Sequence, residues 1–222
     1  MRNEAIAVCR GVGKIYPTTT GDIHALIGVD ASFPAAALTA LVGPSGSGKS
    51  SLLRILAALD RPSEGSVEVG EEWVSEMGAR ARRRVRRRSL RYVFQRPSDN
   101  LISYLTVMGH MKLAAEITHS DKTQLDEILE RLGIAHRKDN RPDELSGGEQ
   151  QRLAFAQAIV GDPLLVVADE PTAELDAAST HSTIELMRAL AEEGTCLVVA
   201  THDPAVAHAA SQTIELMRGR RA

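Results

Sequence analysis

The feature that most constrains this chain is a glycine-rich loop set between a strand-like and a helix-like segment. Residues 43–51 read Gly-Pro-Ser-Gly-Ser-Gly-Lys-Ser-Ser, after the strand-like residues 38–42. The G-x-x-x-x-G-K-[ST] spacing turns a strand into a helix through glycines whose backbone N–H groups can approach a polyphosphate. The helix N-terminus adds the positive end of its dipole. This pattern predicts a phosphate-binding loop, and the alternative is a glycine-rich turn that binds nothing.

The side chains at the end of this loop have predicted roles of their own. Lys49 can reach the β- and γ-phosphates of a nucleotide as a mobile positive charge. The Ser50 hydroxyl is placed to bind the Mg²⁺ that bridges those phosphates, and Ser51 is a further phosphate donor. The other loop residues predicted to contact the nucleotide are Gly43, Ser45, Gly46, Ser47 and Gly48.

Length and charge limit what the rest of the chain can be. The 222 residues suit a single α/β domain, and a net charge of −3 argues against a nucleic-acid partner. Cys9 and Cys196 lie far apart within apolar segments, which predicts reduced core residues. Residues 1–4 show no secretion signal, and no run of about 18 apolar residues occurs. Any membrane role is therefore expected to come through a partner.

The N-terminal part of the chain is expected to form β-strands. Residues 5–9 and 23–33 are strand-like, with a polar turn at residues 17–22 between them. Tyr16 lies at the entrance to this turn, ahead of the phosphate loop. An exposed aromatic ring can stack on a purine base, so Tyr16 is a candidate nucleotide contact; the alternative is an ordinary tyrosine at a strand end.

A basic segment and a further strand follow the phosphate loop. Residues 80–91 are rich in arginine, which would suit nucleic acid or anionic lipid, but no aromatic residues are interleaved. We therefore favour a solvated helix face. Residues 90–94 then predict a buried strand. Gln95 follows that strand and is a candidate to sense Mg²⁺, the γ-phosphate or the attacking water.

After helix-length amphipathic pieces in residues 96–143, the chain reads Leu-Ser-Gly-Gly-Glu-Gln-Gln-Arg-Leu at 145–153. Ser146 and Glu149 satisfy a capping box that starts a helix. A capping box does not require Gly147 and Gly148 in the first turn, where each glycine weakens the helix by up to about 1 kcal/mol. The two glycines therefore favour a helix N-terminus that approaches a phosphate.

Two buried strands are predicted to end in catalytic side chains. Residues 163–168 are continuously apolar and lead into Asp169, a candidate Mg²⁺ ligand, and Glu170, a candidate to orient or deprotonate the attacking water. Residues 196–200 form the last strand and lead to His202, which can donate a hydrogen bond to the γ-phosphate. The tail, residues 215–221, is expected to be a short polar ending.

Taken together and in this order, these motifs resemble the ATP-binding subunit of an ABC transporter over almost the whole chain. Residues 145–150 match the family's signature, which is far more specific than the phosphate loop. Residues 14–16 are similar to the family's adenine-stacking segment, which strengthens the interpretation of Tyr16. Residues 42–53, 58–65 and 201–204 resemble the bacterial group that serves lipoprotein release, macrolide or antimicrobial-peptide export and cell division.

The resemblance implies an α/β fold with a RecA-like core, an N-terminal antiparallel β-subdomain and a helical subdomain over about residues 96–150 of a single 1–222 domain. It implies an ATPase that uses ATP and Mg²⁺ and drives a separate integral-membrane permease from the cytoplasmic face. It also implies a head-to-tail dimer, with a second copy or a related subunit as partner and cargo and direction left open. The residues expected to complete the partner's nucleotide site are Ser146, Gly147 and Gly148, with Asp176 as a further nucleotide contact.

The chain departs from the family pattern at two places. Residues 109–110 are Gly-His where the family usually has Glu-Asn, and residues 173–174 are Ala-Glu where a Ser or Gly is common first. Two rival functions also stand beside the transporter. A soluble ABC ATPase of DNA repair or translation usually carries two nucleotide domains or a coiled-coil insertion. A P-loop kinase would not need the signature.

Overall fold

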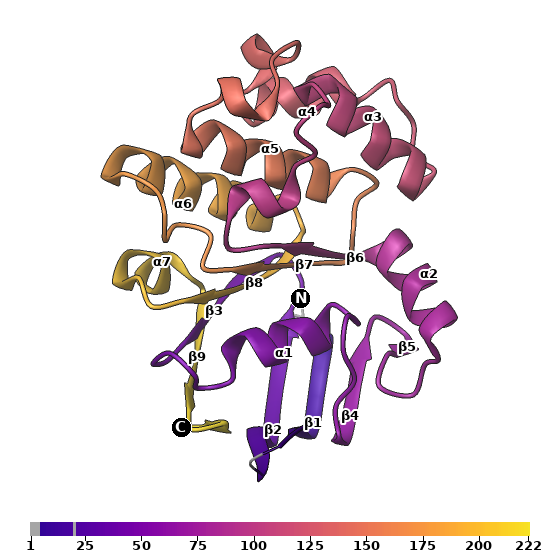
Figure 1. Ribbon diagram of the computed structural model, residues 1–222, viewed down its shortest axis with the longest axis vertical. Coiled ribbons are helices and arrows are strands. Elements are labelled where there is room, and N and C mark those ends of the chain that lie inside the picture. Colours follow the sequence, from indigo (N-terminus) through magenta and orange to yellow (C-terminus); the bar gives the residue numbers. More distant parts are fainter. Residues whose placement is uncertain (1–4, 20) are drawn as a thin grey trace.

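The computed structural model describes residues 5–19 and 21–222, in which two sheets and a set of helices pack together (Figure 1). Residues 1–4, on which the argument against a secretion signal rested, and Thr20 of the expected turn lie outside this range. The strands are β1 (Ala5–Thr18), β2 (Gly21–Pro34), β3 (Ala37–Val42), β4 (Glu64–Val69), β5 (Glu72–Trp73), β6 (Leu90–Val93), β7 (Leu165–Asp169), β8 (Cys196–Thr201), β9 (Gln212–Met217) and β10 (Arg220–Arg221). The helices are α1 (Lys49–Leu56), α2 (Ala79–Ser89), α3 (Val107–Thr118), α4 (Leu125–Arg131), α5 (Gly147–Ile159), α6 (Ala177–Glu192) and α7 (Pro204–Ala209).

The larger sheet positions the candidate site. Its strand order is β10-β9-β3-β8-β7-β6, and every neighbouring pair is parallel except β10 with β9. Because β3, β7 and β8 are parallel, their carboxyl ends meet at one edge of the sheet, where ligands bind in folds of this kind. The phosphate loop follows β3, Asp169 ends β7 and His202 follows β8, so all three are brought to the same edge.

The central strands are buried on both faces, as the continuous apolar runs predict. In β7, Leu165 and Val167 pack into a core shared with α1 and the antiparallel sheet, whereas Val166 and Ala168 pack against the helices. All four side chains are fully buried. Figure 1 shows α1 on one side of this sheet and α5 and α6 on the other. Each strand thus stabilises two cores at once.

The smaller sheet has the antiparallel order β2-β1-β4-β5. Strand β1 is longer than the predicted residues 5–9. Its pairing with β2 continues through several register shifts, past Gly11 and as far as Thr18. These irregularities break the alternation of apolar and polar residues from which a strand is recognised. The connection to β2 is correspondingly shorter than the predicted turn, since Thr18 already pairs with Gly21.

The tail was wrongly expected to be a short polar ending. Residues 212–217 form β9, which pairs in parallel with β3 at the centre of the fold. Ile214 and Leu216 are buried, while Thr213, Glu215 and Met217 between and beside them are exposed. The polar residues that suggested a surface tail are therefore the outer face of a half-buried strand.

Two other predictions about the fold are confirmed. Residues 79–89 form a helix, α2, on which Arg86 donates to the Ala58 carbonyl at 2.7 Å and most other arginines face solvent. Cys9 and Cys196 are free and buried, and burial raises the pKa of each thiol to about 12. Across residues 5–19 and 21–222, the helices include none with the length and apolarity needed to span a membrane.

Candidate nucleotide site

The glycine-rich loop between β3 and α1 follows a path that side chains would block. Gly43 has φ 146°, and an added Cβ would lie 2.1 Å from the Leu216 carbonyl oxygen. Gly48, the N-cap of α1, has φ 103°, and an added Cβ would lie 2.4 Å from the carbonyl oxygen of Ala25. The loop is therefore fitted between β2 and β9 and keeps its backbone open to a ligand.

Lys49 is held at the centre of this loop. Its Nζ donates to the carbonyl oxygens of Gly43 at 2.8 Å and Pro44 at 3.3 Å, and lies 3.8 Å from Glu170 Oε1. The residue is 7% exposed, so its charge is screened little by solvent. A buried positive group at the start of a helix is suited to a polyphosphate.

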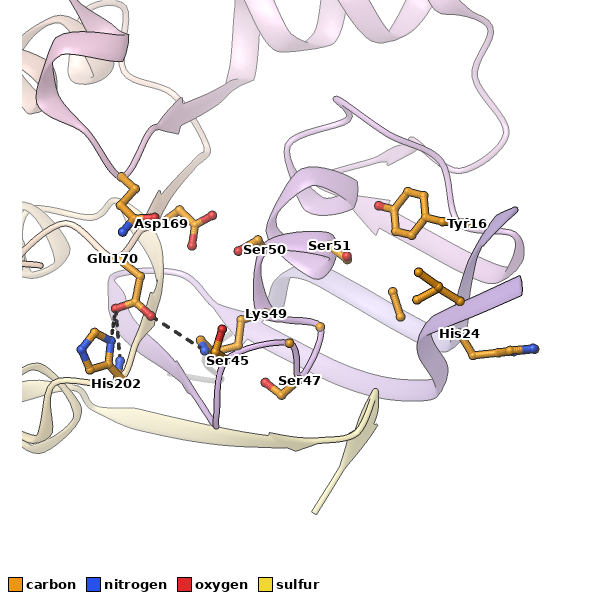
Figure 2. Close-up of a pocket in the computed structure, with 15 residues that line it drawn as sticks. Tyr16, His24, Ser45, Ser47, Lys49, Ser50, Ser51, Asp169, Glu170 and His202 are labelled. Carbon is orange, nitrogen blue, oxygen red and sulfur yellow. Dashed lines mark hydrogen bonds and ion pairs between the residues drawn. The ribbon is translucent and has the colours of Figure 1, made fainter. Parts of the chain in front are cut away.

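Glu170 and His202 meet across the carboxyl ends of β7 and β8. Glu170 Oε2 accepts from the His202 backbone N–H at 3.2 Å and lies 2.9 Å from its Nδ1 (Figure 2). The Glu170 backbone is left-handed, with φ 47°, which is costly for a residue with a side chain. This conformation turns the carboxylate over the sheet edge toward Lys49.

Asp169 lies beside Glu170 and is held by a residue that the sequence did not single out. The Tyr92 hydroxyl on β6 donates to Asp169 Oδ2 at 3.0 Å. Burial, followed by the Asp169 carboxylate, raises the pKa of Tyr92, so the hydroxyl stays protonated and able to donate. In the sequence, the neighbours of Tyr92 indicated only that it belongs to a strand. Its reach to Asp169 depends on how β6 and β7 are paired.

A single cleft of about 760 Å³ brings most of the predicted residues together (Figure 2). Asp169, Ser50 and Gln95 supply oxygen ligands of the kind that Mg²⁺ prefers, and phosphates and water would complete its shell. The sequence missed Ile23, His24 and Ala25, which β2 places in the cleft beside Tyr16. The predicted residues that line it are Tyr16, Ser45, Gly46, Ser47, Gly48, Lys49, Ser50, Ser51, Gln95, Asp169, Glu170 and His202, and Gly43 lies at the base of the same loop.

The signature residues and Asp176 are not among the residues that line this cleft. Ser146 caps α5: its hydroxyl accepts from the Glu149 N–H at 3.3 Å, while Glu149 Oε2 accepts from the Ser146 N–H at 2.8 Å. Asp176 caps α6 through its carboxylate alone: Oδ1 accepts from the Ser179 N–H and Oδ2 from the Ser179 hydroxyl, each at 2.9 Å. The capping box is confirmed, and Ser146 and Gly147 are exposed.

The two signature glycines differ in what requires them. A Cβ on Gly148 would lie 2.7 Å from Ser179 Oγ, so close packing between α5 and α6 explains this glycine within the chain. A Cβ on Gly147 would lie 3.6 Å from the nearest atom, an ordinary contact with Leu175. Packing between α5 and α6 thus explains Gly148 without a phosphate, whereas among the described residues no close contact requires a glycine at position 147.

The sequence profile of the ABC transporter family matches residues 26–173, two thirds of the chain. The chain belongs to the ABC transporter family. It is an ATP-binding cassette of the type found in lipoprotein-release and macrolide-export proteins, and cassettes of this family are ATPases.

Two curated relatives illustrate the group. The cassette is 36% identical to the lipoprotein-releasing system ATP-binding protein LolD of Pseudomonas syringae, over 99% of this chain and 98% of that protein. It is 38% identical to the macrolide export ATP-binding/permease protein MacB 1/2 of Paracoccus denitrificans, over 95% of this chain. The cassette spans about a third of the length of that second relative, 32%.

A solved structure agrees with the fold. The dimeric ATP-binding cassette MJ0796, bound to ADP and Pi in a post-hydrolysis state, superposes with a TM-score of 0.86. The two chains are 31% identical, over 97% of this one and 96% of MJ0796. The predicted α/β fold, with its antiparallel β-subdomain and inserted helices, is confirmed.

The first departure from the family pattern has a structural role in this cassette. His110 is buried, its Nε2 accepts from the Ile102 N–H at 2.8 Å, and its Nδ1 donates to the Thr106 carbonyl at 2.8 Å. Burial lowers the pKa of His110, so the ring is neutral and its Nε2 remains an acceptor. His110 thereby ties the start of α3 to the loop after Gln95. At the second departure, Glu174 lies 3.7 Å from Arg96 Nε at the surface.

The capping box of the signature should make stability depend on pH through Glu149. The hydrogen bond from Arg137 Nε at 2.8 Å, with that from the Ser146 N–H, lowers the pKa of Glu149 to about 2 from its ordinary 4.5. Because the folded pKa is lowered, this stabilisation is complete above about pH 4.5 and is lost as the pH falls toward 2.

We therefore expect Glu149→Gln to lower the free energy of unfolding by about 1 kcal/mol near neutral pH. The difference between wild type and variant should shrink below about pH 4.5, as measured by urea unfolding at several pH values. Glu71→Gln, in the exposed turn between β4 and β5, is the matched control and should show no such trend. A difference for Glu149→Gln that stays constant with pH would contradict the assignment.

Proposed function

We propose that this cassette binds ATP in the cleft and hydrolyses it within a head-to-tail pair of cassettes, which drives a separate integral-membrane permease. Residues 1–222 would act as one domain, with a helical subdomain over about residues 96–150. The partner cassette is a second copy of this chain in the simplest case. The protein would then lie on the cytoplasmic face of the membrane, held there through the permease.

In this proposal the phosphates of ATP lie along the loop before α1, with Lys49 on the β- and γ-phosphates and Ser51 as a further donor. Tyr16 stacks on the base. Glu170 orients and deprotonates the attacking water, and His202 donates to the γ-phosphate. Bound between Ser50, Gln95 and Asp169, Mg²⁺ would neutralise charge on the phosphate oxygens. The hydrogen bond from Tyr92 supports this role for Asp169, because it fixes one carboxylate oxygen and leaves the other available.

The observation that carries the proposal is the separation of the signature from the cleft. Ser146 and Gly147 are exposed at the start of α5, and neither lines the cleft that holds Lys49 and Glu170. The open helix end can donate N–H groups to a phosphate on another molecule. If the partner's signature closes over the γ-phosphate, closure requires ATP and loosens when hydrolysis removes that charge. Asp176 is proposed to reach the nucleotide across the same closed interface.

Replacing Gly147 tests this arrangement. A Cβ at Gly147 fits within the chain, and an acidic side chain suits a helix N-terminus, so Gly147→Glu should fold normally. We expect it to keep the ATP affinity of the isolated cassette and to lose Mg²⁺-dependent ATP hydrolysis by at least about tenfold, because the carboxylate repels the partner's γ-phosphate. A variant with full activity would show that the signature takes no part in the site.

Two experiments distinguish a transporter ATPase from a P-loop kinase and from a soluble ABC ATPase. Steady ATP hydrolysis without any added acceptor would count against a kinase. Co-purification from membranes with a permease, and no change in activity on addition of DNA or RNA, would count against a soluble ATPase of repair or translation. The relatives named for lipoprotein release and macrolide export suggest the permeases to test first.

A further inference from the structure

Lys14 is a buried cation beside Tyr16, at the end of the cleft where the base of ATP is proposed to bind. It has no part in the proposed hydrolysis. It precedes Tyr16 by two residues on β1, so both side chains project from the same face of the strand. Lys14 is only 9% exposed. Its Nζ donates to Asp60 Oδ1 at 2.8 Å and to the Arg61 carbonyl oxygen at 2.8 Å. A buried lysine of this kind is costly unless its charge is paired, as it is here.

The same pair fixes the ring of Tyr16 in two ways. The Tyr16 hydroxyl donates to Asp60 Oδ2 at 3.1 Å, so both carboxylate oxygens are engaged. The Lys14 Nζ lies 4.8 Å from the centre of the Tyr16 ring, in a cation–π contact. Tyr16 is half-buried and lines the cleft (Figure 2). It pairs across the strands with Ile23 on β2, which lines the same cleft. The Tyr16 ring is therefore held by its hydroxyl group and by the Lys14 ammonium, while the residue still lines the cleft.

Asp60 connects this ring to the helix that carries the phosphate loop. The Asp60 N–H donates to the carbonyl oxygen of Arg54, in the last turn of α1, at 3.1 Å. Helix α1 begins at Lys49, so a short rigid segment runs from the loop to Asp60. Although burial raises the pKa of Asp60, the hydrogen bonds from Lys14 and the Arg61 N–H lower it below its usual value, which keeps the carboxylate charged.

We propose that Lys14 and Asp60 are positioning residues that set the Tyr16 ring at a fixed place relative to the phosphate loop, ready to stack on the base of ATP. This inference rests on the proposed function, in which Tyr16 contacts the base. A ring that is already ordered loses less conformational freedom when the base binds, so the pair increases affinity without touching ATP. The effect should be confined to ligands that carry a base.

The chain contains a matched control for the same chemistry outside the cleft. Arg10 lies 5.2 Å from the centre of the Trp73 ring and 3.0 Å from Glu68 Oε2, so a cation, a carboxylate and an aromatic ring are again joined on the antiparallel sheet. None of these three residues lines the nucleotide cleft. Glu68→Gln therefore removes a similar ion pair without changing Tyr16.

The experiment compares Asp60→Asn, Lys14→Met, Tyr16→Ala and Glu68→Gln in the assembled transporter. The readouts are kcat and KM for Mg-ATP and the inhibition constant of Mg-tripolyphosphate, which occupies the phosphate loop but has no base. We expect Asp60→Asn and Lys14→Met to raise KM about five- to tenfold with kcat within about twofold. Tyr16→Ala should raise KM about tenfold or more, and the double variant Asp60→Asn/Tyr16→Ala no further.

Binding of tripolyphosphate should not change in any of these variants, and Glu68→Gln should behave as wild type. If KM rises only in Tyr16→Ala, the positioning role is overturned and the nucleotide site stands. If tripolyphosphate binding weakens in parallel with KM, the pair supports the loop or the fold in general, and the proposal is again wrong. If Tyr16→Ala itself leaves KM unchanged, the base site of the proposed function fails, and this inference fails with it.

Discussion

Replacing Glu170 with Gln is expected to reduce ATP turnover by at least about 100-fold while leaving the affinity for Mg-ATP within about threefold. An amide has nearly the same shape as a carboxylate and can still accept the His202 N–H, so the sheet edge should keep its geometry. It cannot take a proton from water. The variant should therefore close around ATP and remain closed, and accumulate as a nucleotide-bound pair of cassettes.

Single-turnover kinetics and size-exclusion chromatography with ATP would measure both effects. Glu174→Gln is a suitable control, because Glu174 lies four residues along the same loop but is exposed and pairs with the exposed Arg96. Its turnover should equal that of wild type. If Glu170→Gln hydrolysed ATP at the full rate, Glu170 would have no part in activating water.

Replacing Lys49 with Ala is expected to weaken Mg-ATP binding by about 100-fold and to abolish measurable hydrolysis. Its ammonium is the charged donor held inside the loop, and charge-assisted hydrogen bonds to phosphates are among the stronger polar interactions. The two variants thus differ in kind, since Glu170→Gln should trap the nucleotide whereas Lys49→Ala should not retain it.

Binding of a fluorescent ATP analogue, displaced by unlabelled Mg-ATP, would measure this loss. Lys112→Ala, which removes an exposed lysine on α3, should bind as wild type does. Urea unfolding would show whether Lys49→Ala remains folded once the carbonyls of Gly43 and Pro44 lose their donor. Wild-type affinity in a folded Lys49→Ala protein would exclude the loop as the phosphate site.

The sequence predicted those parts of the fold in which local pattern and tertiary environment agree. A strand buried on both faces, such as β7, has an unbroken apolar sequence, and a phosphate loop has a fixed spacing of glycine, lysine and serine. Strand β9 was missed because only Ile214 and Leu216 face the core, and six residues are too few for alternation to stand out. The predicted first strand was too short, because register shifts in β1 interrupt the alternation of apolar and polar residues.

The same distinction applies to the site. Residues within a motif, such as Lys49 and Glu170, could be named from spacing alone. Tyr92 and Ile23 could not, because the contact of Tyr92 with Asp169 and the place of Ile23 in the cleft both follow from strand pairing. The separate reasons for Gly147 and Gly148 also needed the structure, since only the packing of α5 on α6 distinguishes them.

The central claim is that each cassette supplies half of a nucleotide site, and the position of Ser146 tests it most directly. The measurement is the structure of the Glu170→Gln cassette with its permease and saturating Mg-ATP. We predict that Ser146 Oγ lies about 3 Å from a γ-phosphate oxygen of the ATP held by the partner cassette's phosphate loop. A closed, ATP-loaded assembly in which Ser146 is remote from every triphosphate would contradict the account.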